Sequence, residues 1–134
     1  MAFEDLYRLS AHAVITDEVG RVLLLKSTYG SLAWGLPGGA LDRGETIHDC
    51  LSRECMEELG QMVRLGPLTG VYLHSSVNSH VFIFRAELSA PADIRLSTEH
   101  SEFRWFPLEE LSAVQRVRVE DCLRFEGDVS SAKF

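Results

Sequence analysis

Three glutamates within five residues, Glu54, Glu57 and Glu58, offer the clearest chemistry in this sequence. On a helix with 100° per residue, the three side chains project from one side. Apolar residues that should face a core project from that same side: Ile47, Cys50 and Leu51. A solvated acidic face, which is the common arrangement, would lie opposite the apolar stripe. We therefore expect the three carboxylates to converge toward the protein interior.

Converging carboxylates repel one another unless positive charge neutralises them. Arg53 can pair with Glu57 four residues later, but one guanidinium does not balance three acids. A divalent cation would balance their charge. Ligand sets made only of oxygen atoms favour Mg²⁺ or Mn²⁺ over Zn²⁺. In the preceding loop, Gly38 and Gly39 let the backbone approach an ion or a phosphate closely, and Glu45 could brace the loop or reach the site.

A helix over residues 47–59 must hold these acids, with Thr46 and Asp49 as a capping box and Gly60 as a left-handed stop. Residues 13–15 and 22–25 predict a hairpin of buried strands around a turn at 17–20. Further strands are expected at 34–36 within a glycine-rich loop over 28–45, at 62–73 with an interruption, at 81–88 with one face mainly buried, and at 103–106. Helices are expected at 107–111 and 117–125. Because strands and helices do not alternate regularly, the pattern predicts an α+β fold, an α/β/α sandwich with helices flanking a mixed β-sheet.

The length of 134 residues and a near-average composition predict a single domain over residues 1–134. The net charge of −7, with no basic stripe, disfavours binding along a nucleic-acid backbone. The sequence has no apolar run that would span a bilayer and no apolar core of a signal peptide near its N-terminus, so no membrane association is expected. Three cysteines without a CxxC motif fit a reducing, cytoplasmic setting better than a disulfide framework.

Residues 39–61 resemble the Nudix box of the Nudix hydrolase family. Seven fixed positions of that pattern match: Gly39, Glu45, Arg53, Glu54, Glu57, Glu58 and Gly60. Chance agreement with all seven positions over a chain of this length is on the order of one in ten million, given average residue usage. Residues 34–39 also resemble the strand that leads into the box, and residues 99–111 resemble a late stretch common in the family. Cys55 and Gln61 depart from apolar positions of the pattern, and neither change removes a carboxylate.

The resemblance implies a Mg²⁺-dependent pyrophosphohydrolase that cleaves a nucleoside diphosphate linked to another moiety by attack of metal-activated water on phosphorus. The substrate would be a nucleotide sugar, an ADP-ribose-like compound or a damaged nucleoside triphosphate. By the same resemblance, Glu54, Glu57 and Glu58 hold metal ions, with a contribution from the Gly38 carbonyl.

The resemblance also implies catalytic roles beyond metal binding. Arg53 would orient the carboxylates, and Glu54 or a later acid would act as the general base. Because some family members take the base from a loop near the late stretch, Glu99 and Glu102 are secondary candidates.

The expected substrate contacts are glycine and glutamate positions of the box together with aromatic and histidine residues on strands: Trp34, Gly39, Glu45, Tyr72, His80 and Phe84. Trp34 stacks either on a base or in the core, and the last three face either substrate or core. The remaining histidines lack the spacing of a metal site and are interpreted as structural: His12, His48, His74 and His100.

Two other functions are weighed against hydrolysis. A catalytically silent, nucleotide-binding regulatory module with the same fold would usually lack box glutamates, and this sequence keeps all of them. An isomerase of isoprenoid diphosphates would need a catalytic cysteine and normally shows a degraded box. Because many relatives dimerise, a homodimer is the expected assembly.

Overall fold

The computed structural model describes residues 2–134, which form two β-sheets, two α-helices and three short 3₁₀ turns. The strands are β1 (Arg8–Val14), β2 (Val22–Ser27), β3 (Trp34–Gly35), β4 (Gly38–Ala40), β5 (Val63–His74), β6 (Ser79–Leu88), β7 (His100–Phe106) and β8 (Ser130–Lys133). The helices are α1 (Ile47–Leu59) and α2 (Ala113–Leu123), and the 3₁₀ turns are η1 (Ala2–Glu4), η2 (Ser75–Val77) and η3 (Leu108–Glu110).

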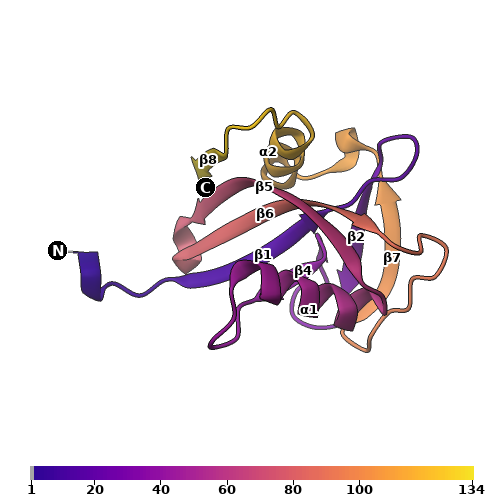
Figure 1. Ribbon diagram of the computed structural model, residues 1–134, viewed down its shortest axis with the longest axis horizontal. Helices are drawn as coiled ribbons and strands as arrows, with labels where there is room; N and C mark the ends of the chain where they lie inside the picture. The colour runs from indigo at the N-terminus through magenta and orange to yellow at the C-terminus, as the bar shows by residue number, and fades with distance from the viewer. Residues whose placement is uncertain (1) are drawn as a thin grey trace.

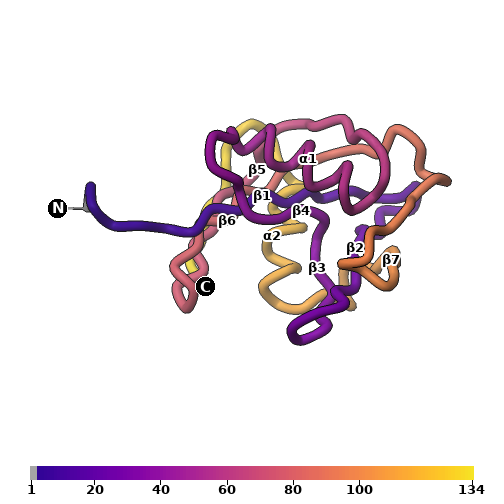
Figure 2. The backbone as a smooth tube through the Cα atoms, turned by 90° about the horizontal axis from the view of Figure 1, so that it is seen from below, coloured from indigo at the N-terminus to yellow at the C-terminus, as the bar shows by residue number. Residues whose placement is uncertain are grey.

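The larger sheet is mixed and has the strand order β4-β1-β6-β5-β8, with β1 parallel to β6 and β5 parallel to β8. The smaller sheet is antiparallel, in the order β3-β2-β7. Helices α1 and α2 lie on opposite faces of the larger sheet (Figure 2), and each covers its own hydrophobic core. This arrangement confirms the predicted α+β sandwich.

Helix α1 begins and ends where the sequence predicts. The Thr46 hydroxyl accepts from the Asp49 N–H, the Asp49 carboxylate accepts from the Thr46 N–H, and Gly60 closes the helix with φ of 70°. The helix packs against β1, β4 and β5 and runs along the lower edge of the molecule in Figure 1. Its position fixes which of its side chains face the sheet.

The predicted hairpin is only partly right. The turn forms, because the Asp17 N–H donates to the Arg21 carbonyl at 2.9 Å and Thr16 bridges to Val22. The strands then separate, since β1 enters the larger sheet and β2 the smaller one. Both are buried as predicted, because each sheet presents an inner face to a core.

Three further differences come from pairing between distant segments. The loop over 28–45 contains a second strand, β4, which pairs with β1. Strand β6 is buried on both faces rather than one, because it lies centrally between β1 and β5. The strand β8 was not predicted, and the segment 107–111 forms only the short turn η3.

Residues 2–7 extend away from the body of the protein (Figures 1 and 2), and Phe3 and Leu6 on this arm are almost fully exposed. Within residues 2–134 there is no helix long and apolar enough to cross a membrane. The three cysteines are buried and unpaired: Cys50, Cys55 and Cys122.

Candidate active site

Glu58 is a carboxylate at the interface between α1 and the sheet, only 4% exposed. Its Oε1 atom accepts a hydrogen bond from the Gly38 N–H at 2.7 Å. Its Oε2 atom lies 3.7 Å from Nε2 of His100 on β7. Burial, and next the charges of neighbouring glutamates, raise the pKa of Glu58 to about 8, although the Gly38 N–H opposes that rise. The site therefore holds a carboxyl group whose charge is not compensated by the protein.

The loop before α1 fits around these acids because two glycines lack side chains. A Cβ atom on Gly39 would lie 2.6 Å from the carboxyl carbon of Glu54. A Cβ atom on Gly38, whose φ is 138°, would lie 2.1 Å from the Ala11 carbonyl oxygen. Both glycines thus let the backbone of β4 pass directly between β1 and the glutamates of α1.

Arg53 connects the loop to the acids of α1. Its Nε and Nη2 atoms donate to the two oxygens of Glu45 at 2.7 and 2.9 Å, and Nη2 also donates to the Ala40 carbonyl at 3.2 Å. Its Nη1 atom donates to Glu54 at 3.0 Å and to both oxygens of Glu57 at 3.4 Å. One guanidinium therefore positions three carboxylates, as a bidentate fork allows.

Glu45 braces the loop. Besides the two bonds from Arg53, its Oε1 atom accepts from the Asp42 N–H at 2.7 Å. The bonds from Arg53, and then the one from Asp42, lower the pKa of Glu45 to about 2, so this carboxylate stays ionised. These contacts are what the first of the two roles considered for Glu45 requires, and a contact of Glu45 with a ligand stays a proposal.

The three box glutamates do not face inward equally. Glu58 is buried, the Glu54 side chain is 14% exposed, and the Glu57 side chain is 55% exposed. The buried stripe of α1 centres near Leu51 and Cys55, and Glu57 is the glutamate farthest from that stripe around the helix. The expectation of three inward carboxylates is therefore right for Glu58, nearly right for Glu54 and wrong for Glu57.

The late segment brings Glu99 and His100 to these acids. The Glu99 charge contributes to raising the pKa of both Glu54 and Glu58. Glu102 instead lies 3.7 Å from the Lys26 ammonium across the β2–β7 pair. His100, interpreted as structural in the sequence, stands beside Glu58, and its buried Nδ1 atom has no hydrogen-bond partner within residues 2–134. The pairing of β7 with β2 produces this proximity, and nothing in the local sequence indicates it.

The family is decided by comparison with known proteins. The sequence profile described as the NUDIX domain matches residues 6–122. The chain belongs to the Nudix family. A MutT-like protein of Streptomyces ambofaciens is 32% identical over 126 residues, which cover 91% of this chain and 80% of that relative.

Solved structures agree with this assignment of the Nudix fold. An ADP-ribose pyrophosphatase of Streptococcus suis 89-1591 superimposes with a TM-score of 0.79 at 20% identity, covering 95% of this chain and 100% of that one. The MutT protein of Methanosarcina mazei Go1 gives a TM-score of 0.72 at 30% identity, with 91% and 96% covered. The protein is thus a Nudix hydrolase, a pyrophosphohydrolase of a family whose substrates are nucleoside diphosphate derivatives and which typically uses a divalent metal.

The acids of this Nudix hydrolase fit a hard divalent cation by their chemistry. Burial raises the pKa of Glu54 as well as that of Glu58, and the charges of Glu57 and Glu99 add to both effects. All these donors are oxygens, as Mg²⁺ and Mn²⁺ prefer. In the described chain, residues 2–134, no three acidic, histidine or cysteine side chains are grouped closely enough to hold an ion, while Arg53 engages Glu54 and Glu57.

Two of the aromatic residues expected at the substrate lie in the core instead, which corrects that expectation. Tyr72 and Phe84 have no exposed surface. Tyr72 donates its hydroxyl hydrogen bond to Asp121 at 2.8 Å and packs on the α2 side, whereas Phe84 packs on the α1 side. Central strands of a mixed sheet bury both faces, so neither ring reaches a ligand.

Trp34 and His80 remain partly exposed but have protein partners. The Trp34 ring packs edge-on against Phe106 at 5.1 Å, and the Arg104 guanidinium lies 5.1 Å from its centroid. His80 packs edge-on against Tyr7 at 4.9 Å near the start of β6. A role for either in substrate binding stays a proposal.

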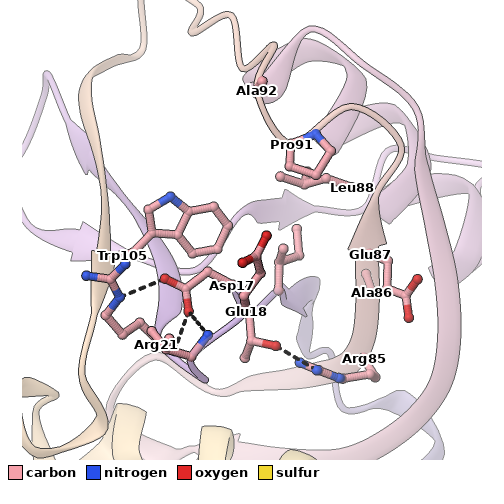
Figure 3. A pocket seen from close by; sticks show the side chains of 13 residues that line it. Asp17, Glu18, Arg21, Arg85, Ala86, Glu87, Leu88, Pro91, Ala92 and Trp105 are labelled. Carbon is pink, nitrogen blue, oxygen red and sulfur yellow. Dashed lines mark hydrogen bonds and ion pairs between the residues drawn. The ribbon is translucent and has the colours of Figure 1, made fainter.

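A recess of about 690 Å³ lies apart from these acids. Figure 3 shows Arg21 paired with Asp17 beside Trp105, and Arg85 of β6 on the other side of the recess. None of the candidate catalytic or metal-binding residues lines it. The candidate site is therefore distinguished by its buried carboxylates and not by the volume of this recess.

The raised pKa of Glu58 predicts how stability depends on pH when divalent cations are chelated. The native state binds the Glu58 proton up to about pH 8, whereas the unfolded chain releases it near about 4.3. The free energy of unfolding should therefore fall as pH rises between these values, by at most about 1.4 kcal/mol per unit for this proton. Urea unfolding from pH 5 to 9 in EDTA should show a shallower fall for Glu58→Gln than for the wild type.

An exposed glutamate on η3 provides the control for this experiment, since Glu109→Gln should keep the wild-type dependence on pH. Equal slopes for the wild type and Glu58→Gln would mean that Glu58 is not the buried acid described here.

Proposed function

We propose that this Nudix hydrolase cleaves a nucleoside diphosphate linked to another moiety, by attack of water on phosphorus. The observation that supports it most is the buried Glu58 carboxyl group, which accepts from the Gly38 N–H beside Glu54 and has no cationic partner of its own within residues 2–134 except the adjacent His100. An anionic diphosphate and an anionic site meet only where a cation lies between them. Residues 1–134 act as one catalytic unit in this proposal.

The residues that would hold Mg²⁺ or Mn²⁺ are Glu54, Glu57 and Glu58, together with the Gly38 carbonyl. When bound, such an ion supplies charge neutralisation for phosphate oxygens and lowers the pKa of water. The protein contributes position: the Gly38 N–H fixes the Glu58 carboxylate, and Arg53 fixes Glu54 through the loop that carries Glu45. Positioning and charge dominate phosphoryl transfer, so little covalent chemistry is needed from the chain.

A general base must take one proton from the attacking water. Within residues 2–134, Arg53 donates to Oε1 of Glu54 and no protein donor reaches its Oε2 atom. The raised pKa of Glu54, caused mainly by burial, moves this group toward the range that suits proton transfer at neutral pH. We assign the base to Oε2 of Glu54. Glu99 is the second choice, because the charge of Glu99 acts on Glu54. Glu102 is not preferred, because its carboxylate pairs with Lys26.

The substrate class is a nucleotide sugar, an ADP-ribose-like compound or a damaged nucleoside triphosphate. The Streptococcus suis pyrophosphatase acts on ADP-ribose by its name, but at 20% identity it supports the fold and not the substrate. Among the partly exposed aromatic residues, Trp34 is the one we propose to contact the nucleoside, since it directly precedes the loop of Gly38 and Gly39.

Substitutions of the box glutamates test the metal and base assignments. Glu57→Gln and Glu58→Gln each remove an anionic ligand while keeping size, so turnover should fall by several orders of magnitude and the fold should survive. Glu99→Gln should lower turnover less. The measurement is release of phosphate or nucleoside monophosphate from a substrate panel with MgCl₂, with circular dichroism to verify folding.

Glu102→Gln is the matched control, because it lies on the same late segment and pairs with Lys26 instead of facing the acids. It should keep the wild-type rate. Full activity of both Glu57→Gln and Glu58→Gln would refute the metal assignment.

We also propose that the protein forms a homodimer through its N-terminal arm. Phe3 and Leu6 are 93% and 87% exposed, and large apolar side chains on a projecting arm are costly in water unless a second molecule covers them.

Light scattering should give twice the chain mass of 15.0 kDa. The double variant Phe3→Ser, Leu6→Ser should give the monomer mass, and Val19→Ser, at an exposed turn, should remain dimeric. A wild-type monomer at micromolar concentration would contradict the proposal.

A further inference from the structure

Arg118 on α2 is a partly buried arginine without a carboxylate partner within residues 2–134. Its Nη2 atom donates to the Gln115 side chain, and Nη1 lies 3.4 Å from Nε2 of His74. Its Nε atom is buried and has no hydrogen-bond partner in the described chain. By contrast, Arg116 on the same helix pairs with Glu120 at 2.5 Å. Burial lowers the pKa of Arg118, which shows that the protein does not compensate this charge.

Two histidines share the surroundings of Arg118. Burial, and next the Arg118 charge, lower the pKa of His74, and the same causes lower that of His12 to about 4. Both imidazoles are therefore neutral at pH 7. All three side chains nevertheless keep part of their surface accessible. We call Arg118, His74 and His12 the basic cluster.

The two acids nearest in sequence to Arg118 are both engaged, since Glu120 pairs with Arg116 and Arg124. Asp121, one turn along α2 from Arg118, accepts the Tyr72 hydroxyl at 2.8 Å and makes no ion pair with Arg118. In a chain with a net charge of −7, the Arg118 guanidinium is thus a positive charge that no acidic side chain of residues 2–134 pairs with.

The basic cluster lies next to the catalytic acids across one strand. His12 on β1 pairs with Gly38 on β4, and the Gly38 N–H donates to Glu58. A Cβ atom on Gly38 would lie 2.8 Å from Nδ1 of His12, so the imidazole directly adjoins that backbone. The acids belong to the α1 side of the sheet and Arg118 to α2 on the other side (Figure 2). Because β4 is the edge strand of the larger sheet, a substrate that contacts both the acids and Arg118 must pass this edge at Gly38.

We propose that the basic cluster binds a second anionic group of the substrate, a phosphate or carboxylate carried by the moiety beyond the scissile diphosphate. This inference rests on the proposed function, because the diphosphate itself is assigned to the acids of α1. An unpaired, partly desolvated guanidinium is costly, and an anion from the ligand would remove that cost. The weakly engaged Nη1 atom, 3.4 Å from Nε2 of His74, is a donor suited to an anionic oxygen.

The proposed substrate belongs to a narrower class than nucleoside diphosphate derivatives as a whole. The preferred substrate is a nucleoside diphosphate derivative with one more negative group, such as a sugar acid or a phosphorylated ribose. A neutral analogue would leave Arg118 unpaired, so the site should discriminate against it.

Two pairs of probes that differ only in this group provide the test. UDP-glucuronate is compared with UDP-glucose for a carboxylate, and ADP-ribose 2′-phosphate with ADP-ribose for a phosphate. The rise in unfolding temperature caused by each probe, with MgCl₂, measures binding without requiring turnover. In at least one pair, the acidic probe should bind the wild type at least about tenfold more tightly than the neutral probe does. A charge-assisted hydrogen bond contributes a free energy of this size.

Arg118→Gln should abolish this preference, and Arg118→Lys, which keeps the charge, should retain part of it. Arg116→Gln, on the same helix but paired with Glu120, should keep the full preference. Without ligand, Arg118→Gln should unfold at or above the wild-type temperature, because the substitution removes an unpaired, partly buried charge. An arginine that stabilised the fold would give the opposite result. A lower unfolding temperature for this variant would contradict the inference.

Chromatography of the same samples for nucleoside monophosphate tests the proposed function separately. A preference that requires Arg118 but brings no hydrolysis would support the basic cluster and refute the activity on these probes. Hydrolysis in which neither acidic probe is preferred, or in which Arg118→Gln keeps the preference, would overturn the inference and leave the proposed function intact.

Discussion

The burial of one carboxyl group, that of Glu58, constrains the rest of this site. A carboxylate between α1 and the sheet must be solvated by the protein, and within residues 2–134 the Gly38 N–H is the backbone donor that reaches it. That bond requires β4 to lie against β1 with glycines at both 38 and 39, since a side chain at either position would collide. The hydrogen bond from the Gly38 N–H thus ties the loop before α1 to the helix at this one group.

Arg53 offsets the electrostatic repulsion between the neighbouring carboxylates of α1. Left alone, Glu54 and Glu57 would repel each other and the loop would have no tie to α1. The fork of Arg53 reaches Glu45 on the loop and both glutamates on the helix, so the guanidinium fixes geometry while leaving the buried Glu58 uncompensated. An arginine thereby organises the acids without cancelling their charge.

Local sequence was sufficient for what depends on local geometry. The helix α1, its caps and the inward position of Glu58 follow from periodicity and from Thr46, Asp49 and Gly60. Periodicity alone misplaced Glu57, because the buried stripe runs about half a turn from Cys50 to Leu59 and Glu57 lies just outside its Cys50 edge. His100, Arg118 and strand β8 depend on contacts between segments far apart in the sequence, such as β5 with β8. No spacing rule contains that information.

Titration calorimetry of the purified protein with MgCl₂ or MnCl₂ tests the central claim most directly. The account predicts saturable binding of the metal that weakens as pH falls below the raised pKa of Glu58, near about 8, since a proton and a cation compete for the same carboxylate. Binding should be lost in Glu58→Gln. Absence of metal binding by the wild type at pH 8, with and without a nucleoside diphosphate, would contradict the account.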